Sequence, residues 1–130
     1  MTQEDKQLLL VDFCGRLPYR VIVHHPDYDE PQTLDTVLTP DAWLEGGIMC
    51  TADDHWDSPH DIRCCKPYLR PMSSMTEDEK KEYHELCDSY CGIYFDSVRS
   101  VDWLNKKMFD YRGLIPMGLA DEAPEGMYNI

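Results

Sequence analysis

Basic residues are scarce in this chain, and their scarcity argues against several classes of partner. The 130 residues include 12 Lys and Arg against 25 Asp and Glu, for a formal net charge of −13 at pH 7. Nucleic-acid binders usually carry a basic patch, and anionic membrane surfaces attract the same side chains. We therefore expect no direct nucleic-acid binding and no membrane association. The acidic excess is greater in residues 1–65, with 13 acidic and 4 basic residues, than in residues 66–130, with 12 and 8.

Long apolar runs and a secretion signal are also lacking. The longest apolar run covers residues 8–11, far short of the roughly 20 residues that cross a bilayer. The first residues, Met-Thr-Gln-Glu-Asp-Lys, do not follow the basic-then-apolar pattern of a signal peptide. We expect a cytoplasmic protein, in which the six cysteines are reduced.

The sequence also lacks recognisable catalytic signatures. The sequence contains no phosphate-binding loop, no dinucleotide glycine fingerprint, and no recognisable nucleophile motif around a Ser or Cys. The interpretation favours a non-enzymatic protein, and the sequence implies no cofactor.

The residues that are present suit a folded domain, because 42% are hydrophobic and 11% are aromatic. We predict one α+β domain over 1–130, with a helix and sheet in 1–71 and a helical part and tail in 72–130. It has an N-terminal helix, a small, strongly bent antiparallel sheet of three to five strands, two C-terminal helices packed on the sheet and an irregular tail that wraps back. The predicted elements are helices over 2–16, 76–94 and 101–108, and strands over 19–25, 33–39, 48–51 and 61–69.

Three helix starts have capping signals. Thr2 with Asp5 and Thr76 with Glu79 have the spacing of a capping box, in which each side chain accepts a hydrogen bond from the other residue's backbone N–H. Ser100 is the predicted cap of the short helix over 101–108.

The acidic loops of the first half hold the first candidate sites. The loop over 53–61 combines carboxylates with imidazoles, which are ligands for divalent metals, and this alternative uses Asp53, Asp54, His55, Asp57 and His60. The loop lacks the glycine and closing glutamate of an EF-hand. The other interpretation is a protein-binding surface formed by Asp53, Asp54, Trp56, Asp57, Trp43, Asp27, Asp29 and Glu30.

The second half holds two further candidates. His84, Cys87 and Cys91 lie three and four residues apart on the predicted helix over 76–94, as zinc ligands would, with Cys64 or Cys65 as a fourth donor. The alternative is that these cysteines belong to an apolar helix stripe together with Tyr83, Tyr90 and Tyr94.

The triplet Asp110, Tyr111 and Arg112 follows the short helix. It is either a ligand site or a means of fixing the tail through hydrogen bonds and a charge pair.

Several stretches carry a resemblance. They are LLVDFCGRLPY over 9–19, KPYLRPMSSMTEDEKKEY over 66–83, DWLNKKMFDYRGLIPMGLA over 102–120 and EAPEGMYN over 122–129. Over residues 8–25 and 66–129 the chain resembles a family of uncharacterised proteins encoded by phages, prophages and other mobile elements of gut bacteria. The resemblance implies no activity, and it does not extend to the acidic stretch over 26–65.

These observations lead to one main functional expectation and two alternatives. The main one is a protein-interaction or host-modulating factor of a phage or mobile element, acting through an acidic surface on a basic host or phage protein, as a monomer or small homo-oligomer. One alternative is a metal-binding domain or metal-dependent enzyme that uses the loop over 53–61. The other is a purely structural or small-molecule-binding module with an apolar pocket lined by Tyr90, Tyr94 and Trp103.

Overall fold

The computed structural model describes residues 2–26, 28–38, 47–50, 60–62 and 65–128, and it confirms the predicted α+β class. The elements follow in this order: α1 (Gln3–Arg16), the 3-10 helix η1 (Leu17–Tyr19), β1 (Ile22–His24), β2 (Gln32–Leu38), β3 (Gly47–Cys50), β4 (His60–Asp61), β5 (Lys66–Leu69), the 3-10 helix η3 (Met72–Ser74), α2 (Glu77–Leu86), β6 (Asp88–Tyr90), β7 (Ile93–Phe95), α3 (Val98–Lys106) and β8 (Asp121–Glu122). Among these described helices, none has the length and apolar character that crossing a bilayer requires.

Helix α1 begins at the predicted capping box. The backbone N–H of Asp5 donates to the Thr2 hydroxyl at 3.0 Å, and the Thr2 N–H donates to the Asp5 carboxylate at 3.2 Å. One side of the helix buries Leu9, Leu10 and Phe13. Apolar residues at this spacing share a face, so α1 lies with that face against the sheet core.

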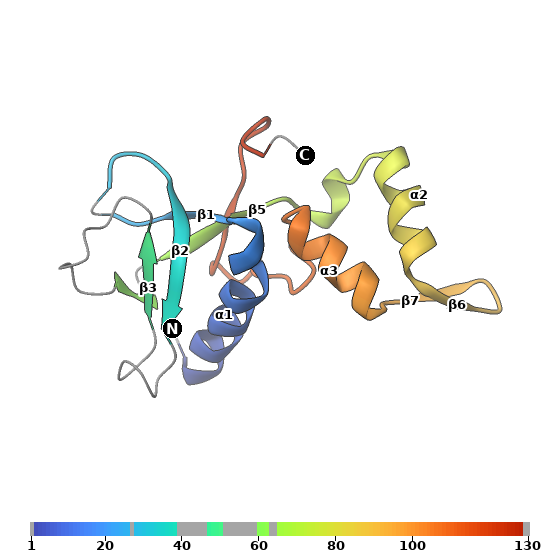
Figure 1. Ribbon diagram of the computed structural model, residues 1–130, viewed down its shortest axis with the longest axis horizontal. Helices are drawn as coiled ribbons and strands as arrows, with labels where there is room; N and C mark the ends of the chain where they lie inside the picture. The colour runs from blue at the N-terminus through green and yellow to red at the C-terminus, as the bar shows by residue number, and fades with distance from the viewer. Residues whose placement is uncertain (1, 27, 39–46, 51–59, 63–64, 129–130) are drawn as a thin grey trace.

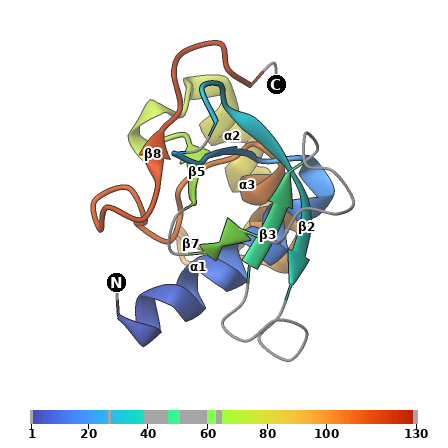
Figure 2. The ribbon, with the colours of Figure 1, turned by 90° about the vertical axis from the view of Figure 1, so that its left-hand side faces the viewer.

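The main sheet has the strand order β4-β3-β2-β1-β5-β8. All neighbours are antiparallel except β5 and β8, which pair in parallel, so the sheet has one strand more than the predicted antiparallel sheet of three to five strands, and that strand is parallel to its neighbour. The extra pairing comes from the tail, which wraps back as predicted but forms the short strand β8 on the sheet instead of being irregular throughout. Figure 2 views the molecule from the end at which this sheet lies.

Two predicted strands have different bounds in the structure. The strand predicted over 19–25 is shorter, because η1 occupies its start and β1 covers only Ile22–His24. The strand predicted over 61–69 is two strands, β4 and β5, on opposite sides of the sheet centre.

The second half departs most from the prediction. Helix α2 begins at the predicted capping box of Thr76 and Glu79 but ends at Leu86, and the chain then forms the hairpin β6–β7 instead of continuing as a helix to Tyr94. Ser97, not Ser100, caps α3, while Ser100 closes the capping box from the third helical position.

Buried residues form two clusters. The larger joins α1 to the sheet and the tail around Phe13, Val23 and Leu114. The smaller joins α2 and α3 around Trp103 and Phe109, so the two later helices pack mainly on each other and, through α3, on α1. Figure 1 shows the result: the sheet lies at one end of the long axis and the hairpin β6–β7 at the other.

Candidate functional site

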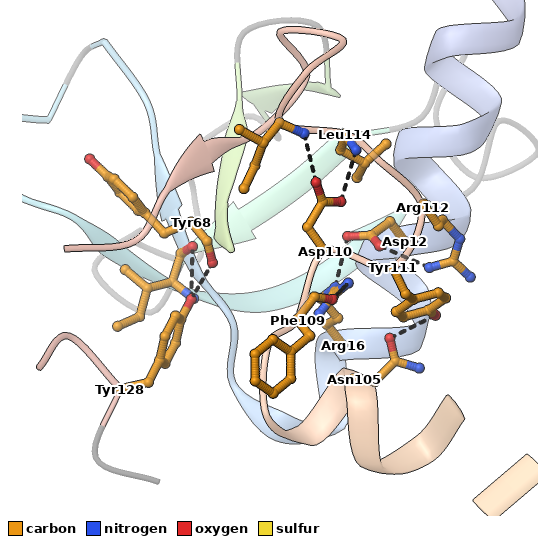
Figure 3. A network of polar contacts seen from close by, with 12 residues as sticks. Asp12, Arg16, Tyr68, Asn105, Phe109, Asp110, Tyr111, Arg112, Leu114 and Tyr128 are labelled. Carbon is orange, nitrogen blue, oxygen red and sulfur yellow. Dashed lines mark hydrogen bonds and ion pairs between the residues drawn. The ribbon is translucent and has the colours of Figure 1, made fainter. Parts of the chain in front are cut away.

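The predicted triplet Asp110, Tyr111 and Arg112 lies in a polar network between α1, the end of α3 and the tail (Figure 3). The buried Asp110 carboxylate accepts hydrogen bonds from the backbone N–H groups of Leu114 at 2.8 Å and Ile115 at 2.9 Å. It therefore holds the turn through which the tail leaves α3.

Two ion pairs meet at Asp12 in the same network. The Asp12 carboxylate accepts from Arg16 Nε at 2.9 Å and from Arg112 Nη1 at 2.8 Å, and Arg16 Nη2 donates to the Phe109 carbonyl at 2.7 Å. The side chains of Asp12 and Arg16 are both 0% exposed. A buried charge is tolerated only when it is paired and hydrogen-bonded, and Asp12 supplies the negative charge for both guanidinium groups.

The ring of Tyr111 contacts both of these arginines. Its ring centroid lies 5.3 Å from the Arg16 guanidinium carbon and 4.6 Å from that of Arg112, and its hydroxyl donates to Asn105 Oδ1 at 2.9 Å. The triplet thus fixes the tail through hydrogen bonds and a charge pair, which confirms the structural interpretation. The acid of that charge pair is Asp12, which the sequence did not single out.

The zinc candidate of the second half is not assembled. Because α2 ends at Leu86, the helical spacing of His84, Cys87 and Cys91 does not apply, and Cys91 lies exposed in the hairpin turn. Cys65 is buried in the larger core cluster. Among the residues that the structure describes, no three His, Cys, Asp or Glu side chains come together in a group that could hold a metal ion.

The candidates in the first half lie mostly outside the described residues. This applies to Asp27, Trp43, Asp53, Asp54, His55, Trp56 and Asp57. Asp29 and Glu30 are exposed just before β2, and His60 is placed at the start of β4 by its backbone.

The hairpin β6–β7 is the feature that sequence reasoning missed. Tyr90 pairs with Ile93 across a two-residue loop of Cys91 and Gly92, whose φ angles are 51° and 79°. Two positive φ angles are typical of a type I′ turn, which matches the twist of two antiparallel strands. The glycine at the second loop position, between aromatic and β-branched residues, was a weak signal for this hairpin, because Cys-Gly is not one of the dipeptides typical of such turns.

The two faces of the hairpin differ. Residues paired across antiparallel strands share a face, so Tyr90, Ile93 and Phe95 lie on one side and Tyr94 on the other. The Tyr94 ring, which is 51% exposed, stacks on His84 of α2, with centroids 4.1 Å apart and planes 6° apart. On the other side, which we call the hairpin face, Tyr90, Ile93 and Phe95 are 74%, 58% and 52% exposed.

Strong contacts support the base of the hairpin. The Tyr83 hydroxyl donates to Asp96, and the Ser97 hydroxyl donates to the Leu86 carbonyl at 2.6 Å. Burial, together with the hydrogen bond to Asp96, raises the pKa of Tyr83. Tyr83 also stacks on Trp103 of α3 at 5.7 Å. The hairpin therefore projects from a braced pair of helices.

Two cavities lie near the surface. One, of about 430 Å³, lies between the residues that follow β5 and the tail and includes Arg70, Ser74 and Tyr128 in its lining. The guanidinium of Arg70 is already engaged, because it donates to the Glu79 carboxylate at 2.9 Å and to the Lys107 carbonyl at 3.2 Å. The other, of about 410 Å³, is an open groove along α2 beside His84. Neither is lined by Asp110, Tyr111 or Arg112.

Comparisons of this chain with protein-family models, with curated proteins and with solved structures find no match.

Proposed function

We propose that this chain is a protein-binding module whose contact surface is the hairpin face of Tyr90, Ile93 and Phe95. The observation that supports the proposal is their exposure, from 52% to 74%, on an element braced from behind. The neighbouring Val98, at the start of α3, is 78% exposed. Clustered large apolar side chains on a charged protein are typical of interaction sites.

The chemistry of the hairpin face suits a protein partner. Tyr is among the residues that most often dominate binding energy at interfaces, because its ring is large, rigid and amphipathic. The face contributes to neither buried cluster, so the fold does not explain its apolar character. The type I′ turn and the Tyr94–His84 stack hold it in place before binding, which lowers the entropy lost on association.

The earlier expectations about partner and origin stay predictions. A phage or mobile-element origin, a cytoplasmic location, a host or phage protein as partner, and a contact surface in the loops over 26–31 and 52–61 rest on the sequence alone. The proposal places the main contact in the second half, which is the less acidic half of the chain.

The proposal can be tested by selecting a random peptide display library on three immobilised proteins. These are the wild type, the face variant Y90S/I93S/F95S, and the control variant V11S/Y19S/M117S. The control changes three other large apolar residues, which are 43%, 36% and 49% exposed and far from the hairpin in sequence.

We expect the wild type and the control variant to enrich the same peptides, and the face variant to lose them. Matched thermal unfolding of all three proteins shows that loss of binding is not loss of fold. If the enriched peptides bind the face variant as well as the wild type, the hairpin face is not the contact surface.

A further inference from the structure

The hairpin β6–β7 also presents strand edges that no described strand covers. We infer that the outer edge of β6 accepts an extended, positively charged segment of the partner as a third strand, an inference that rests on the function proposed above.

The hydrogen-bonding capacity of the edge follows from the turn. In a hairpin closed by a two-residue loop, the residues that flank the loop bond to each other, so Tyr90 and Ile93 are satisfied. The next residue of β6, Ser89, then directs its N–H and C=O away from β7. The sheet contains only β6 and β7 within the described residues, so this edge is unpaired there. Such an edge is a template for strand addition.

The β6 edge is better suited than the β7 edge. Ser89 is small and exposed, whereas the corresponding residue of β7, Tyr94, carries a ring that is stacked on His84. A strand added beside β6 would also lie next to Tyr90 on the hairpin face. Alternate residues of that strand would pack on the Tyr90 ring, because side chains alternate between the two faces of a sheet.

Charge selects the kind of segment. Asp88 lies on β6 opposite Phe95, and Glu85 lies in the last turn of α2; both side chains are exposed. They belong to residues 77–99, which hold seven acidic and three basic side chains, so the local charge repels an acidic strand and attracts Lys and Arg. The same charge opposes a second copy of this chain at the edge, because the two copies would bring negative charges of the same sign close together and repel each other.

The test uses three synthetic eight-residue peptides and the full chain. The first alternates Lys and Val, the second alternates Glu and Val, and the third is the Lys–Val peptide with alternate backbone nitrogens methylated. Binding is measured by fluorescence anisotropy at low and moderate salt. Protection of the Ser89 amide is measured by hydrogen exchange.

We expect the Lys–Val peptide to bind and to protect the Ser89 amide. Its binding should weaken as the salt concentration rises. The Glu–Val peptide should bind at least about tenfold more weakly, because its charge is repelled. The methylated peptide should lose a similar factor, because it cannot complete the strand ladder on one side. The variant S89P, which removes the outward donor, should also lose about tenfold, and the peptide comparisons remain decisive if that variant distorts the hairpin.

Three outcomes overturn the inference. Equal binding of the three peptides, or no binding of any, refutes the basic third strand, while the display selection still decides on its own whether the hairpin face binds proteins. Concentration-dependent dimers in analytical ultracentrifugation that disappear in S89P would show instead that a second copy occupies the edge.

Discussion

Replacing Asp12 by Asn should destabilise the fold more than any change to an exposed charge. Asp12 is the shared acceptor of Arg16 Nε and Arg112 Nη1, at 2.9 and 2.8 Å, and its side chain is wholly buried. Asn keeps the shape of the side chain but removes its charge. Arg16 would then be a positive charge, 0% exposed, without its counter-ion.

The expected size follows from that burial. Removing one partner of a buried ion pair typically costs about 3 to 5 kcal/mol, because the remaining charge is left uncompensated in a medium that solvates it poorly. Arg112 is 20% exposed and can turn toward water, so most of the cost comes from Arg16. The total free energy of unfolding of a domain of this size is about 5 to 15 kcal/mol, so D12N should lose a large part of its stability.

Urea denaturation followed by circular dichroism measures the free energy of unfolding of D12N. The control is E77Q, because Glu77 forms an exposed pair with Lys80 at 3.3 Å. That variant should stay within about 0.5 kcal/mol of the wild type.

A double variant tests the cause. D12L/R16M removes both charges and should be more stable than D12N, because no unpaired buried charge remains. A D12N protein within about 1 kcal/mol of the wild type, or a double variant less stable than D12N, would refute the reasoning.

Three further predictions concern single groups. Burial alone would raise the pKa of Glu79, but hydrogen bonds from Arg70 and the Thr76 backbone outweigh it and hold the pKa below its ordinary value. Its contribution to stability is therefore present above the unfolded pKa of about 4.3 and is lost as pH falls through the folded pKa, so the stability difference between wild type and E79Q should vanish in acid. Iodoacetamide followed by mass spectrometry should label exposed Cys91 before Cys50, since burial, with the charge of Asp35, raises the pKa of Cys50 to about 11. In urea titrations Y128F should cost about 1 to 2 kcal/mol, because the hydroxyl bonds two main-chain groups of the sheet.

Local signals explain where the sequence predicted the fold well. The capping boxes of Thr2 and Thr76 depend on residues three apart, and both form as predicted. The cap of α3 was placed three residues late because Ser97 and Ser100 are both serines at the spacing of a capping box. In the structure the first of them is the cap.

The hairpin was missed because one pattern fits two structures. Tyr83, Tyr90 and Tyr94 repeat at helical spacing, so the stretch was predicted to be one long helix. The positive φ angles at Cys91 and Gly92 are incompatible with one continuous helix, and the glycine at position 92 was the local sign of a turn.

Long-range contacts were beyond sequence reasoning. Nothing near Arg16 in the chain indicates that a basic residue at the end of an amphipathic helix is wholly buried, since one of its partners, Phe109, lies 93 residues away. The parallel pairing of β5 with β8 likewise joins segments more than 50 residues apart. The triplet Asp110, Tyr111 and Arg112 could be singled out, but its acid partner Asp12 could not.

The hydrogen bond from the Ile22 N–H to the Tyr128 hydroxyl, 2.9 Å long, has a consequence for the growing polypeptide. The two residues are 106 positions apart, so the ribosome adds the second roughly 5 to 20 s after the first at typical elongation rates. During that interval the strand containing Ile22 has an open main-chain donor and can pair wrongly with another chain. We therefore expect native assembly of the sheet to be completed only after synthesis of Tyr128, and bulky fusions directly behind that residue to be the most harmful to yield.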